Sequence, residues 1–203
     1  MPSNPNNELM PFIGALSKSN PSIRAKAAGE IFSRGRELAR AAVAKWLADD
    51  ILINCFVLGP SRFPEATVGL AVEPAHFELI WKACGSPHLA DVPPDQDAKE
   101  FEREFPNGVR LDILTTRDPE GQGAMARHLR KFGESIQQIE LLTKSVDETA
   151  QLLRSRFGLI PVFPETRAGA NGTRVNFFLV PAPEGKKVLI EIVEAPASTQ
   201  TLC

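Results

Sequence analysis

The sequence contains little cysteine, little net charge and no long hydrophobic run. Its three cysteines, Cys55, Cys84 and Cys203, are odd in number and widely spaced, which argues against both a disulfide framework and a zinc knuckle. A formal net charge of -2 gives no electrostatic sign of nucleic-acid binding. No apolar stretch is long enough to span a membrane, and the polar residues 1–7 lack the apolar core of a signal peptide. We therefore expect a cytoplasmic protein with neither a nucleic-acid nor a membrane partner.

The composition and length suit a globular protein of one or two modules. Of the 203 residues, 43% are hydrophobic. This length accommodates one domain with an appendage, or two small modules that share a core. Five segments are predicted: a flexible lead (1–20), a helical extension with a linking strand (21–60), a first module (61–132), a second module (133–197) and a tail (198–203).

The extension begins with a helix signal. Asn20 can cap a helix and Pro21 suits its first position, while Gly35 interrupts the pattern, so we expect two short helices or one kinked helix. An apolar stripe is expected at Ile23, Ala27, Ile31, Leu38, Ala42 and Trp46. Residues 51–58 form a continuous apolar run that suits a buried strand or, alternatively, the end of a helix.

The other face of this extension is basic. Its cations are interleaved with Glu30 and Glu37, a pattern more typical of a solvated surface than of an anion site. These cations are Arg24, Lys26, Arg34, Arg36, Arg40 and Lys45. One helical unit cannot bury its own apolar stripe, so it should pack on the remaining domain or form a homodimer.

A strand-and-helix unit occurs twice in the rest of the chain. In each copy a short strand is followed by a helical pattern that stops at a glycine, Gly85 or Gly158. A loop rich in proline and acidic residues comes next, and then an apolar strand that contains a single acid, Asp112 or Glu191. The predicted strands lie at residues 67–72, 109–114, 138–143 and 188–193. Such a duplication predicts an α+β protein built from two similar modules.

Strand alternation places polar side chains on one side of each module. The apolar residues should face the helices, which leaves Thr67 and Gln138 on the opposite, concave side, with the small residue Gly69 beside Thr67. Asp112 and Glu191 interrupt apolar strands, and a carboxylate so placed must face water, a partner charge or a metal. A cleft shared by the two copies would satisfy that requirement.

Three stretches carry a family resemblance: GESIQQI at 133–139, RAGANGTRVNF at 167–177 and VLIEIVE at 188–194. In their order and spacing they resemble the vicinal oxygen chelate superfamily, which includes glyoxalases and bleomycin-resistance proteins. Within it, the methylmalonyl-CoA epimerases are the most similar. The resemblance covers residues 65–194 and implies two βαβββ modules that form a shared curved-sheet cleft.

The resemblance also implies a divalent metal held by the first and last strands of each module. The first-strand histidines of the superfamily fall on Thr67 and Gln138, and the last-strand ligands fall on Asp112 and Glu191. Asp112, Gln138 and Glu191 remain as oxygen ligands, for which Mg²⁺, Mn²⁺ or Co²⁺ is expected rather than Zn²⁺, and Ca²⁺ is also suited. The alternative is a metal-free pocket in which Gln138 hydrogen-bonds Glu191. The iron dioxygenases of the superfamily are excluded, because their triad of two histidines and a carboxylate cannot be assembled.

Two functions follow as expectations. The first is an isomerase, such as an epimerase, or a lyase that acts next to a carbonyl of a small-molecule substrate, with Glu191 as the leading base. Asp95, in a Pro-Asp-Gln loop, is the candidate second acid, or otherwise an exposed turn residue. The second is a small-molecule binding protein that kept the cleft and lost the chemistry.

Substrate contacts are expected from three polar residues: Thr67 in the cleft, and Arg174 and Asn176 near its rim. Together with Arg167, the rim residues can meet an anionic group, or they can serve only as hairpin and surface residues. The sequence leaves these two interpretations open.

Overall fold

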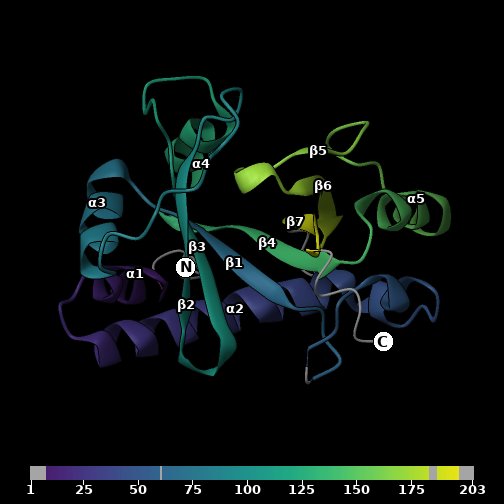
Figure 1. The fold of residues 1–203 in the computed structure, drawn as a ribbon, viewed down its shortest axis with the longest axis horizontal. Coiled ribbons are helices and arrows are strands. Elements are labelled where there is room, and N and C mark those ends of the chain that lie inside the picture. The colour runs from purple at the N-terminus through teal and green to yellow at the C-terminus, as the bar shows by residue number, and fades with distance from the viewer. Residues whose placement is uncertain (1–7, 60, 183–186, 197–203) are drawn as a thin grey trace, which may run out of the picture. The chain divides into compact units, whose positions relative to one another are not determined.

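The computed structural model describes residues 8–59, 61–182 and 187–196. The chain divides into two compact units: unit 1 contains Met1–Gly35 and Thr67–Gln137, and unit 2 contains Arg36–Ala66 and Gln138–Cys203. Helices and strands occur in both units, which confirms the α+β class (Figure 1). No helix in the described part of the chain has the length and apolarity needed to cross a membrane.

Unit 1 contains a βαββ module followed by a helix. Strand β1 pairs in parallel with β3, and β2 pairs antiparallel with β3. The elements are β1 (Ala66–Ala71), α3 (Pro74–Ala83), β2 (Lys99–Phe105), η3 (Pro106–Gly108), β3 (Val109–Thr115) and α4 (Ala124–Phe132). Where a further strand was expected, residues 86–98 form a loop that joins β2 through the Ala90 N–H, which donates to the Glu100 carbonyl oxygen at 3.0 Å.

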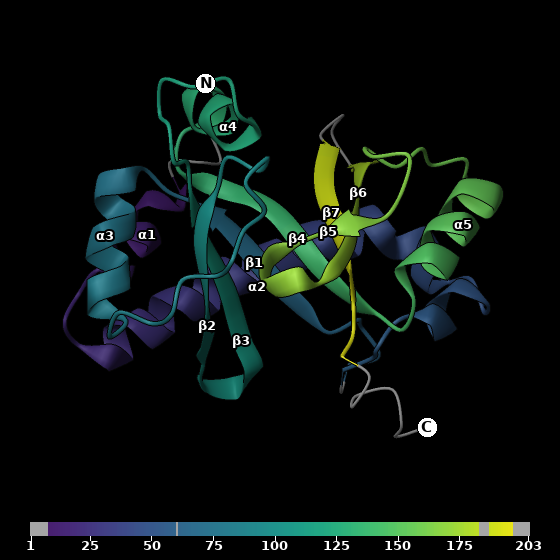
Figure 2. The same ribbon diagram turned by 45° about the horizontal axis from the view of Figure 1, so that its top comes forward.

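The two faces of this three-stranded sheet are covered differently. On one face α3 packs through Phe77, whose ring meets Phe101 of β2 edge-on with centroids 5.3 Å apart. Helix α1 (Met10–Leu16) lies beside α3 in both ribbon views (Figures 1 and 2). On the other face, α4 packs against the ends of β1 and β3 in a cluster formed by Ala71, Leu114, Met125 and Leu129. The rest of that second face carries the polar residues predicted for the cleft.

Unit 2 contains the full βαβββ module. Strand β4 pairs in parallel with β7, β7 with β6 antiparallel, and β6 with the short β5 antiparallel. The elements are β4 (Ser135–Thr143), α5 (Val146–Phe157), β5 (Arg167–Ala168), η4 (Ala170–Gly172), β6 (Arg174–Pro181) and β7 (Lys187–Glu194). Helix α5 packs on β6 and β7 and buries Val146, Thr149 and Leu153. The four predicted strands are therefore β1, β3, β4 and β7.

The ends of α5 follow from local chemistry. Ser145 is the N-cap, and its hydroxyl oxygen accepts a hydrogen bond from the Glu148 N–H at 3.3 Å. Gly158 closes the helix at φ 64°, a left-handed conformation that favours glycine. The predicted glycine stop at Gly158 is confirmed.

The N-terminal region is more helical than predicted. Residues 10–16, expected within a flexible lead, form α1 because Ile13 and Leu16 can be buried there. Helix α2 (Pro21–Leu47) continues through Gly35 as one helix, so the expected two short helices are not found. Its buried residues include Ala28, Ile31, Ala39, Val43 and Trp46. Two members of the predicted stripe, Ile23 and Leu38, are exposed, because the buried face continues through Ala39 instead.

The apolar run at residues 51–58 is mostly not a strand. It begins with a 3-10 helix, η2 (Leu52–Cys55), and then follows the edge of β4. The Val57 N–H donates to the Leu142 carbonyl oxygen at 3.0 Å, and the Leu142 N–H donates to the Glu65 carbonyl oxygen at 2.9 Å. The expected buried strand is thus reduced to a short edge contact.

Candidate functional site

The strand face of unit 2 that points away from α5 carries a group of polar side chains. Glu140 of β4 and Phe177 of β6 are both register partners of Glu191 on β7, so these three side chains share one face. Gln138 lies two residues before Glu140 and shares that face. Its neighbour Ile139 is fully buried on the helix side, as the alternation predicted.

A short hydrogen bond joins the two most buried polar residues of this face. The Gln138 Nε2 atom donates to the Glu191 Oε2 atom at 2.6 Å and lies 3.4 Å from the Glu140 Oε1 atom. Gln138 is 8% exposed and Glu191 7%. A carboxylate with so little access to water needs such a donor, because burying an unpaired charge is costly. The carboxylate is therefore fixed in position by an amide.

This arrangement does not fit a shared metal ion. To bind a metal, Gln138 would present its amide oxygen, whereas its nitrogen is directed at Glu191. Among residues 8–59, 61–182 and 187–196, no group of three His, Cys, Asp or Glu side chains is placed to hold a metal ion. The amide and the carboxylate instead form the direct hydrogen bond that the metal-free alternative predicted.

In unit 1, the corresponding face carries Thr67 and Asp112. Asp112 of β3 is the register partner of Gly69 on β1 and of Glu102 on β2, and Thr67 lies two residues before Gly69 on the same face. Thr67 is 7% exposed and Asp112 is 6% exposed. The predicted placement of both side chains, with a small residue beside Thr67, is confirmed.

Glu100 of β2 is a carboxyl that the sequence interpretation missed. It is the register partner of Leu114, so it lies on the same face as Asp112 and next to the apolar cluster under α4. Burial raises the pKa of Glu100 to about 7, against the opposing effect of the Arg117 charge. The alternation of side chains in Lys99–Phe105 could have predicted this position. Phe101 and Phe105 turn inward, which leaves the glutamates of the strand on the opposite face.

Asp95 lies exposed in a turn, and its catalytic role stays a prediction. The nearby Asp97 has a structural place: its carboxylate accepts hydrogen bonds from the Thr116 hydroxyl at 2.6 Å and the Arg117 N–H at 3.0 Å. Asp97 therefore holds the loop after β3 in place.

The three histidines lie in unit 1. His76 in α3 lies 2.9 Å from the Glu134 carboxylate, and His88 lies in the loop. His128 in α4 lies 2.9 Å from the Ser135 hydroxyl oxygen, and burial lowers the pKa of His128 to about 4. Both helical histidines have local partners within unit 1.

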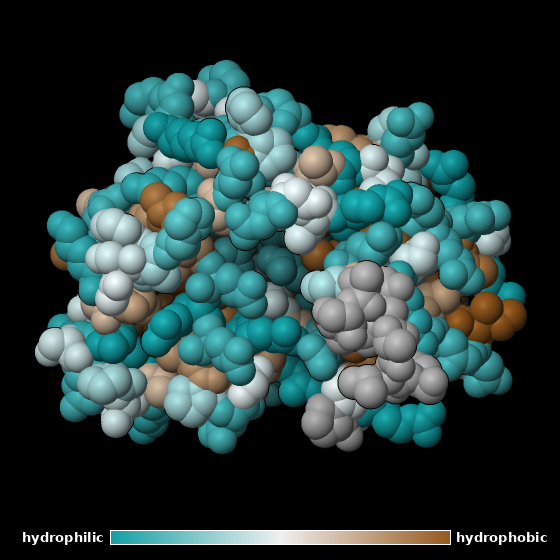
Figure 3. All heavy atoms as spheres, viewed as in Figure 1, coloured by the Kyte–Doolittle hydropathy of each residue, from teal (hydrophilic) through white to brown (hydrophobic). Residues whose placement is uncertain are grey.

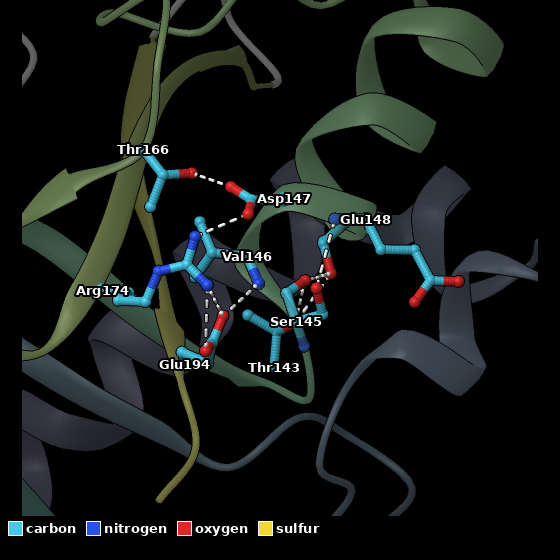
Figure 4. A network of polar contacts seen from close by, with 9 residues as sticks. Thr143, Ser145, Val146, Asp147, Glu148, Thr166, Arg174 and Glu194 are labelled. Atoms are coloured by element: carbon cyan, nitrogen blue, oxygen red, sulfur yellow. Dashed lines mark hydrogen bonds and ion pairs between the residues drawn. The ribbon is translucent and has the colours of Figure 1, made fainter.

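Arg174 and Asn176 lie on the helix side of unit 2, which corrects their expected place at the rim of the cleft. Arg174 donates to Asp147 at 2.5 Å and to Glu194 at 3.2 Å, and these contacts tie β6 to the start of α5 and to β7 (Figure 4). Asn176, 2% exposed, pairs with Ile192 and donates to the Phe163 carbonyl oxygen at 3.3 Å. Because Phe177 points toward the Glu191 face, strand alternation turns both polar residues away from it.

The same network favours the ionised form of the Asp147 carboxyl. Hydrogen bonds from Thr166 and then from Arg174 lower the pKa of the Asp147 carboxyl. The Glu194 carboxylate also accepts from the Val146 N–H at 3.0 Å, at the first turn of α5 (Figure 4). An acid at this end of a helix is also favoured by the helix dipole. These contacts have an architectural role.

An aromatic group borders the Glu191 face. Phe177 meets Phe163 edge-on, with ring centroids 5.9 Å apart, and the Arg167 guanidinium lies 4.3 Å from the Phe163 centroid. Nearby on β6 the side chain of Leu179 is 51% exposed. On the surface drawn in Figure 3, hydrophobic residues are scattered among hydrophilic ones, as is ordinary for a globular protein. Phe177 is therefore the apolar side chain placed next to Glu191, and Phe163 packs against it.

A separate hollow of about 220 Å³ lies in unit 1, between the start of α2 and the end of β2. Its lining includes Arg24 and Arg103 and none of the predicted site residues. Arg24 donates to the carbonyl oxygens of Lys18 and Ser19, both at 2.7 Å, so it holds the turn before α2.

Comparisons with known proteins give matches in structure. No protein-family model and no curated protein matches the sequence. A methylmalonyl-CoA epimerase from Mycobacterium tuberculosis matches with a TM-score of 0.51 and 27% sequence identity, over 66% of this chain and 90% of its own. Structural neighbours of this chain are methylmalonyl-CoA epimerases. One of them, a complex with methylmalonyl-CoA and NH4+, has a TM-score of 0.50 and 23% identity, over 66% of this chain and 96% of its own.

The epimerase fold is that of the vicinal oxygen chelate superfamily, so the resemblance is confirmed at the level of fold. A hypothetical protein from Bacillus halodurans C-125 has the same fold, with a TM-score of 0.52 and 25% identity over 64% of this chain and 92% of its own. Residues 66–194 are 129 of the 203 residues, which is similar to the share covered by the epimerases.

Proposed function

We propose that this protein is an isomerase of the vicinal oxygen chelate superfamily that moves a proton on the carbon next to a carbonyl. The observation that carries the proposal is Glu191, a nearly buried carboxylate held by the Gln138 amide at 2.6 Å beside an aromatic wall. The fold shared with methylmalonyl-CoA epimerases supports the choice of reaction and suggests an acyl thioester as substrate.

Glu191 acts as the base in this proposal. Its carboxylate takes the proton from the α-carbon, and the electrons of the C–H bond pass into an enolate. A second acid then delivers a proton to the opposite face of that carbon, so that its configuration inverts. A carboxylate held in a fixed position suits this task, because a general base must lie within reach of the proton that it removes. The register partner of Glu191 on β6, Phe177, presents an apolar ring on the same face.

Gln138 has two roles in the proposal. One of its N–H groups fixes Glu191, and the other, which lies 3.4 Å from Glu140, can turn to donate to the enolate oxygen. The family resemblance implies that Thr67 and Gln138 stand where the superfamily has metal-binding histidines. Because the Gln138–Glu191 pair does not fit a shared ion, the proposed proton transfer does not depend on one.

Glu100 in unit 1 is a candidate proton carrier in its own right. With a pKa of about 7, it holds its proton over part of the neutral range and can release it at little cost. It is better suited to proton transfer than Asp95, which is exposed in a turn.

A small-molecule binding protein without catalysis is the alternative. The observation that favours it is the same hydrogen bond, because the amide occupies a lone pair of Glu191 that a base would use to take a proton. Proton exchange between substrate and solvent distinguishes the two functions, because only the isomerase exchanges the α-proton.

The test is deuterium exchange at the α-carbon in D₂O, with methylmalonyl-CoA and a panel of other acyl thioesters, followed by NMR. We expect exchange in the parent protein and a loss of about 10²-fold or more in Glu191→Gln, as is usual for removal of a catalytic base. Glu104→Gln, an exposed glutamate on β2, is the matched control and should exchange like the parent.

Three results would contradict the proposal. One is binding of a thioester without any exchange, which would identify the protein as a binding module. Another is exchange that survives in Glu191→Gln. The third is a stoichiometric metal in protein purified without chelators that is lost in Glu191→Ala, which would restore the metal mechanism.

A further inference from the structure

Two leucines extend the apolar surface beside Glu191 along strands β6 and β7. Phe177 and Leu179 alternate on β6, and their register partners on β7 are Glu191 and Leu189. All four side chains therefore lie on the strand face that points away from α5. Glu191, the base of the proposed reaction, thus lies beside an apolar strip formed by Phe177, Leu179 and Leu189.

The apolar strip is open to solvent. Leu179 is 51% exposed, and Phe177 and Leu189 are half-buried. The alternate residues of β6, Phe178 and Val180, are buried on the α5 side, so the strand is well packed and the exposure of Leu179 is confined to one face. Apolar side chains that remain accessible beside a few fixed polar groups are typical of a ligand-binding surface.

The surroundings of Phe177 define the direction in which a ligand can extend from Glu191. The ring of Phe177 meets Phe163 edge-on at 5.9 Å, and its backbone carbonyl oxygen accepts a hydrogen bond from the Val162 N–H at 2.7 Å. Two residues before Phe177, Val175 is 1% exposed and offers no surface to a ligand. Two residues after it, Leu179 is accessible. A ligand held at Glu191 therefore gains apolar contact in the direction of the leucines.

We propose that the substrate is a 2-branched acyl thioester whose apolar chain lies along the strip from Phe177 to Leu179 and Leu189. This inference rests on the proposed function, because Glu191 fixes the position of the α-carbon, and inversion there requires two different substituents. Two residues of a strand span about 6.6 Å, so a methyl group stops short of the leucines, whereas a chain of about four or more carbons reaches them.

The charge of the same face also favours an apolar substituent. Glu140 on β4 is the register partner of Glu191, so two carboxylates lie next to the position of the α-carbon. A substrate with a further carboxylate on that carbon, such as methylmalonyl-CoA, would place a third negative charge beside them. An apolar chain avoids this repulsion and buries surface that is otherwise exposed to water.

A second copy of the chain is a less suitable occupant of the strip. Stable interfaces between proteins bury about 800 Å² on each partner, contributed by about 20–30 residues. The strip consists of three side chains, which is far less than such an interface needs but matches the length of a short acyl chain.

The experiment compares the binding of 2-methylbutanoyl-CoA, 2-methylhexanoyl-CoA and methylmalonyl-CoA to the full chain by calorimetry. Each buried methylene contributes a factor of about four in affinity, so 2-methylhexanoyl-CoA should bind roughly 15-fold more tightly than 2-methylbutanoyl-CoA. Methylmalonyl-CoA should bind more weakly than 2-methylhexanoyl-CoA. Binding is measured without reference to proton exchange, so a preference for the longer chain without any exchange would contradict the proposed function alone.

Matched variants locate the chain on the strip. Leu179→Ser should remove most of the gain from the longer chain, and Leu179→Met, which stays apolar, should keep it. Ile51→Ser is the control: Ile51 is 53% exposed and precedes η2, which packs on α5, so this variant should bind like the parent.

Four results overturn the proposal. They are equal affinities for the two 2-methylacyl thioesters in the parent, an undiminished gain in Leu179→Ser, and tighter binding of methylmalonyl-CoA than of 2-methylhexanoyl-CoA. The fourth is a dimeric parent that becomes monomeric in Leu179→Ser by light scattering, which would identify a second copy as the occupant of the strip.

Discussion

The hydrogen bond between Gln138 and Glu191 can be measured directly as a coupling energy. The perturbations are Gln138→Leu, Glu191→Leu and the double variant, which keep the side-chain volumes similar while removing one or both partners. A double-mutant cycle isolates the interaction from the other effects of each substitution. The pair is suitable because its atoms lie 2.6 Å apart and both residues are nearly buried.

The expected coupling is about 1.5–3 kcal/mol, the range for a hydrogen bond to a charged group. Exposed fractions of 8% and 7% leave little solvent to screen it. For a chain of this length, about 2 kcal/mol corresponds to a shift of roughly 4–8 °C in the unfolding midpoint. The single variants should each be destabilised, and the double variant should be more stable than the sum of the two losses predicts.

The assay is urea unfolding followed by circular dichroism near pH 7, with thermal unfolding as a second measure. Glu140 provides a matched control pair, because its carboxylate lies 3.4 Å from the same amide nitrogen and should couple by less than about 0.5 kcal/mol. A coupling for Gln138 and Glu191 no larger than that of the control would refute the reasoning. So would a coupling that appears only when a divalent metal is added.

Further predictions concern the titration of Glu100 and His128 and the space around two glycines. The folded pKa of Glu100 lies above its ordinary value of 4.5, so the free energy of unfolding should fall as pH rises from about 4.5 to about 7. Glu100→Gln should remove this loss and raise the free energy of unfolding by up to roughly 3 kcal/mol at pH 8, measured by urea unfolding. The folded pKa of His128 lies below its ordinary value of 6.5, so stability should fall as pH drops from 6.5 to about 4; ring NMR signals that titrate near 6.5 would contradict this. Gly123→Ala should lower the free energy of unfolding by about 1–3 kcal/mol, because the added Cβ overlaps the side chain of Asp97. Gly29→Ala, whose Cβ meets nothing within 4 Å in α2, is the matched control and should stabilise by about 0.5–1 kcal/mol.

The strands and helices of the duplicated unit could be predicted because their signals are local. Apolar runs marked β1, β3, β4 and β7, and Gly158 marked the end of α5. The alternation of side chains then placed Gln138 and Glu191 on one face, which the register confirms. The hydrogen bond expected between these two residues is observed.

The predictions failed for residues whose surroundings are set by contacts with residues distant in sequence. Arg174 and Asn176 are polar in sequence, but their partners Asp147 and Phe163 come from α5 and a loop that only the folded chain brings near. The environment of Glu100 likewise depends on residues distant in sequence, among them Leu114 and its apolar cluster. Such tertiary contacts override what a strand pattern alone can show.

The continuity of α2 was missed for a related reason. A glycine within a helix costs about 1 kcal/mol relative to alanine, which favours an interruption on local grounds. Gly35 is buried, however, and burial of the apolar stripe on either side of it outweighs that cost. Helix α1 formed for the same reason, because Ile13 and Leu16 are buried.

The short edge contact made by residues 55–65 has a practical consequence. Val57 and Glu65 occupy the backbone N–H and C=O groups of Leu142, which would otherwise lack partners at this point of β4. Open edges recruit strands from other molecules and cause aggregation. A truncated version that begins at β1, close in length to the epimerases, would lose the Val57 contact and should therefore be prone to aggregate. The segment before β1 should thus protect the module from self-association. The sequence of this N-terminal segment did not indicate that role.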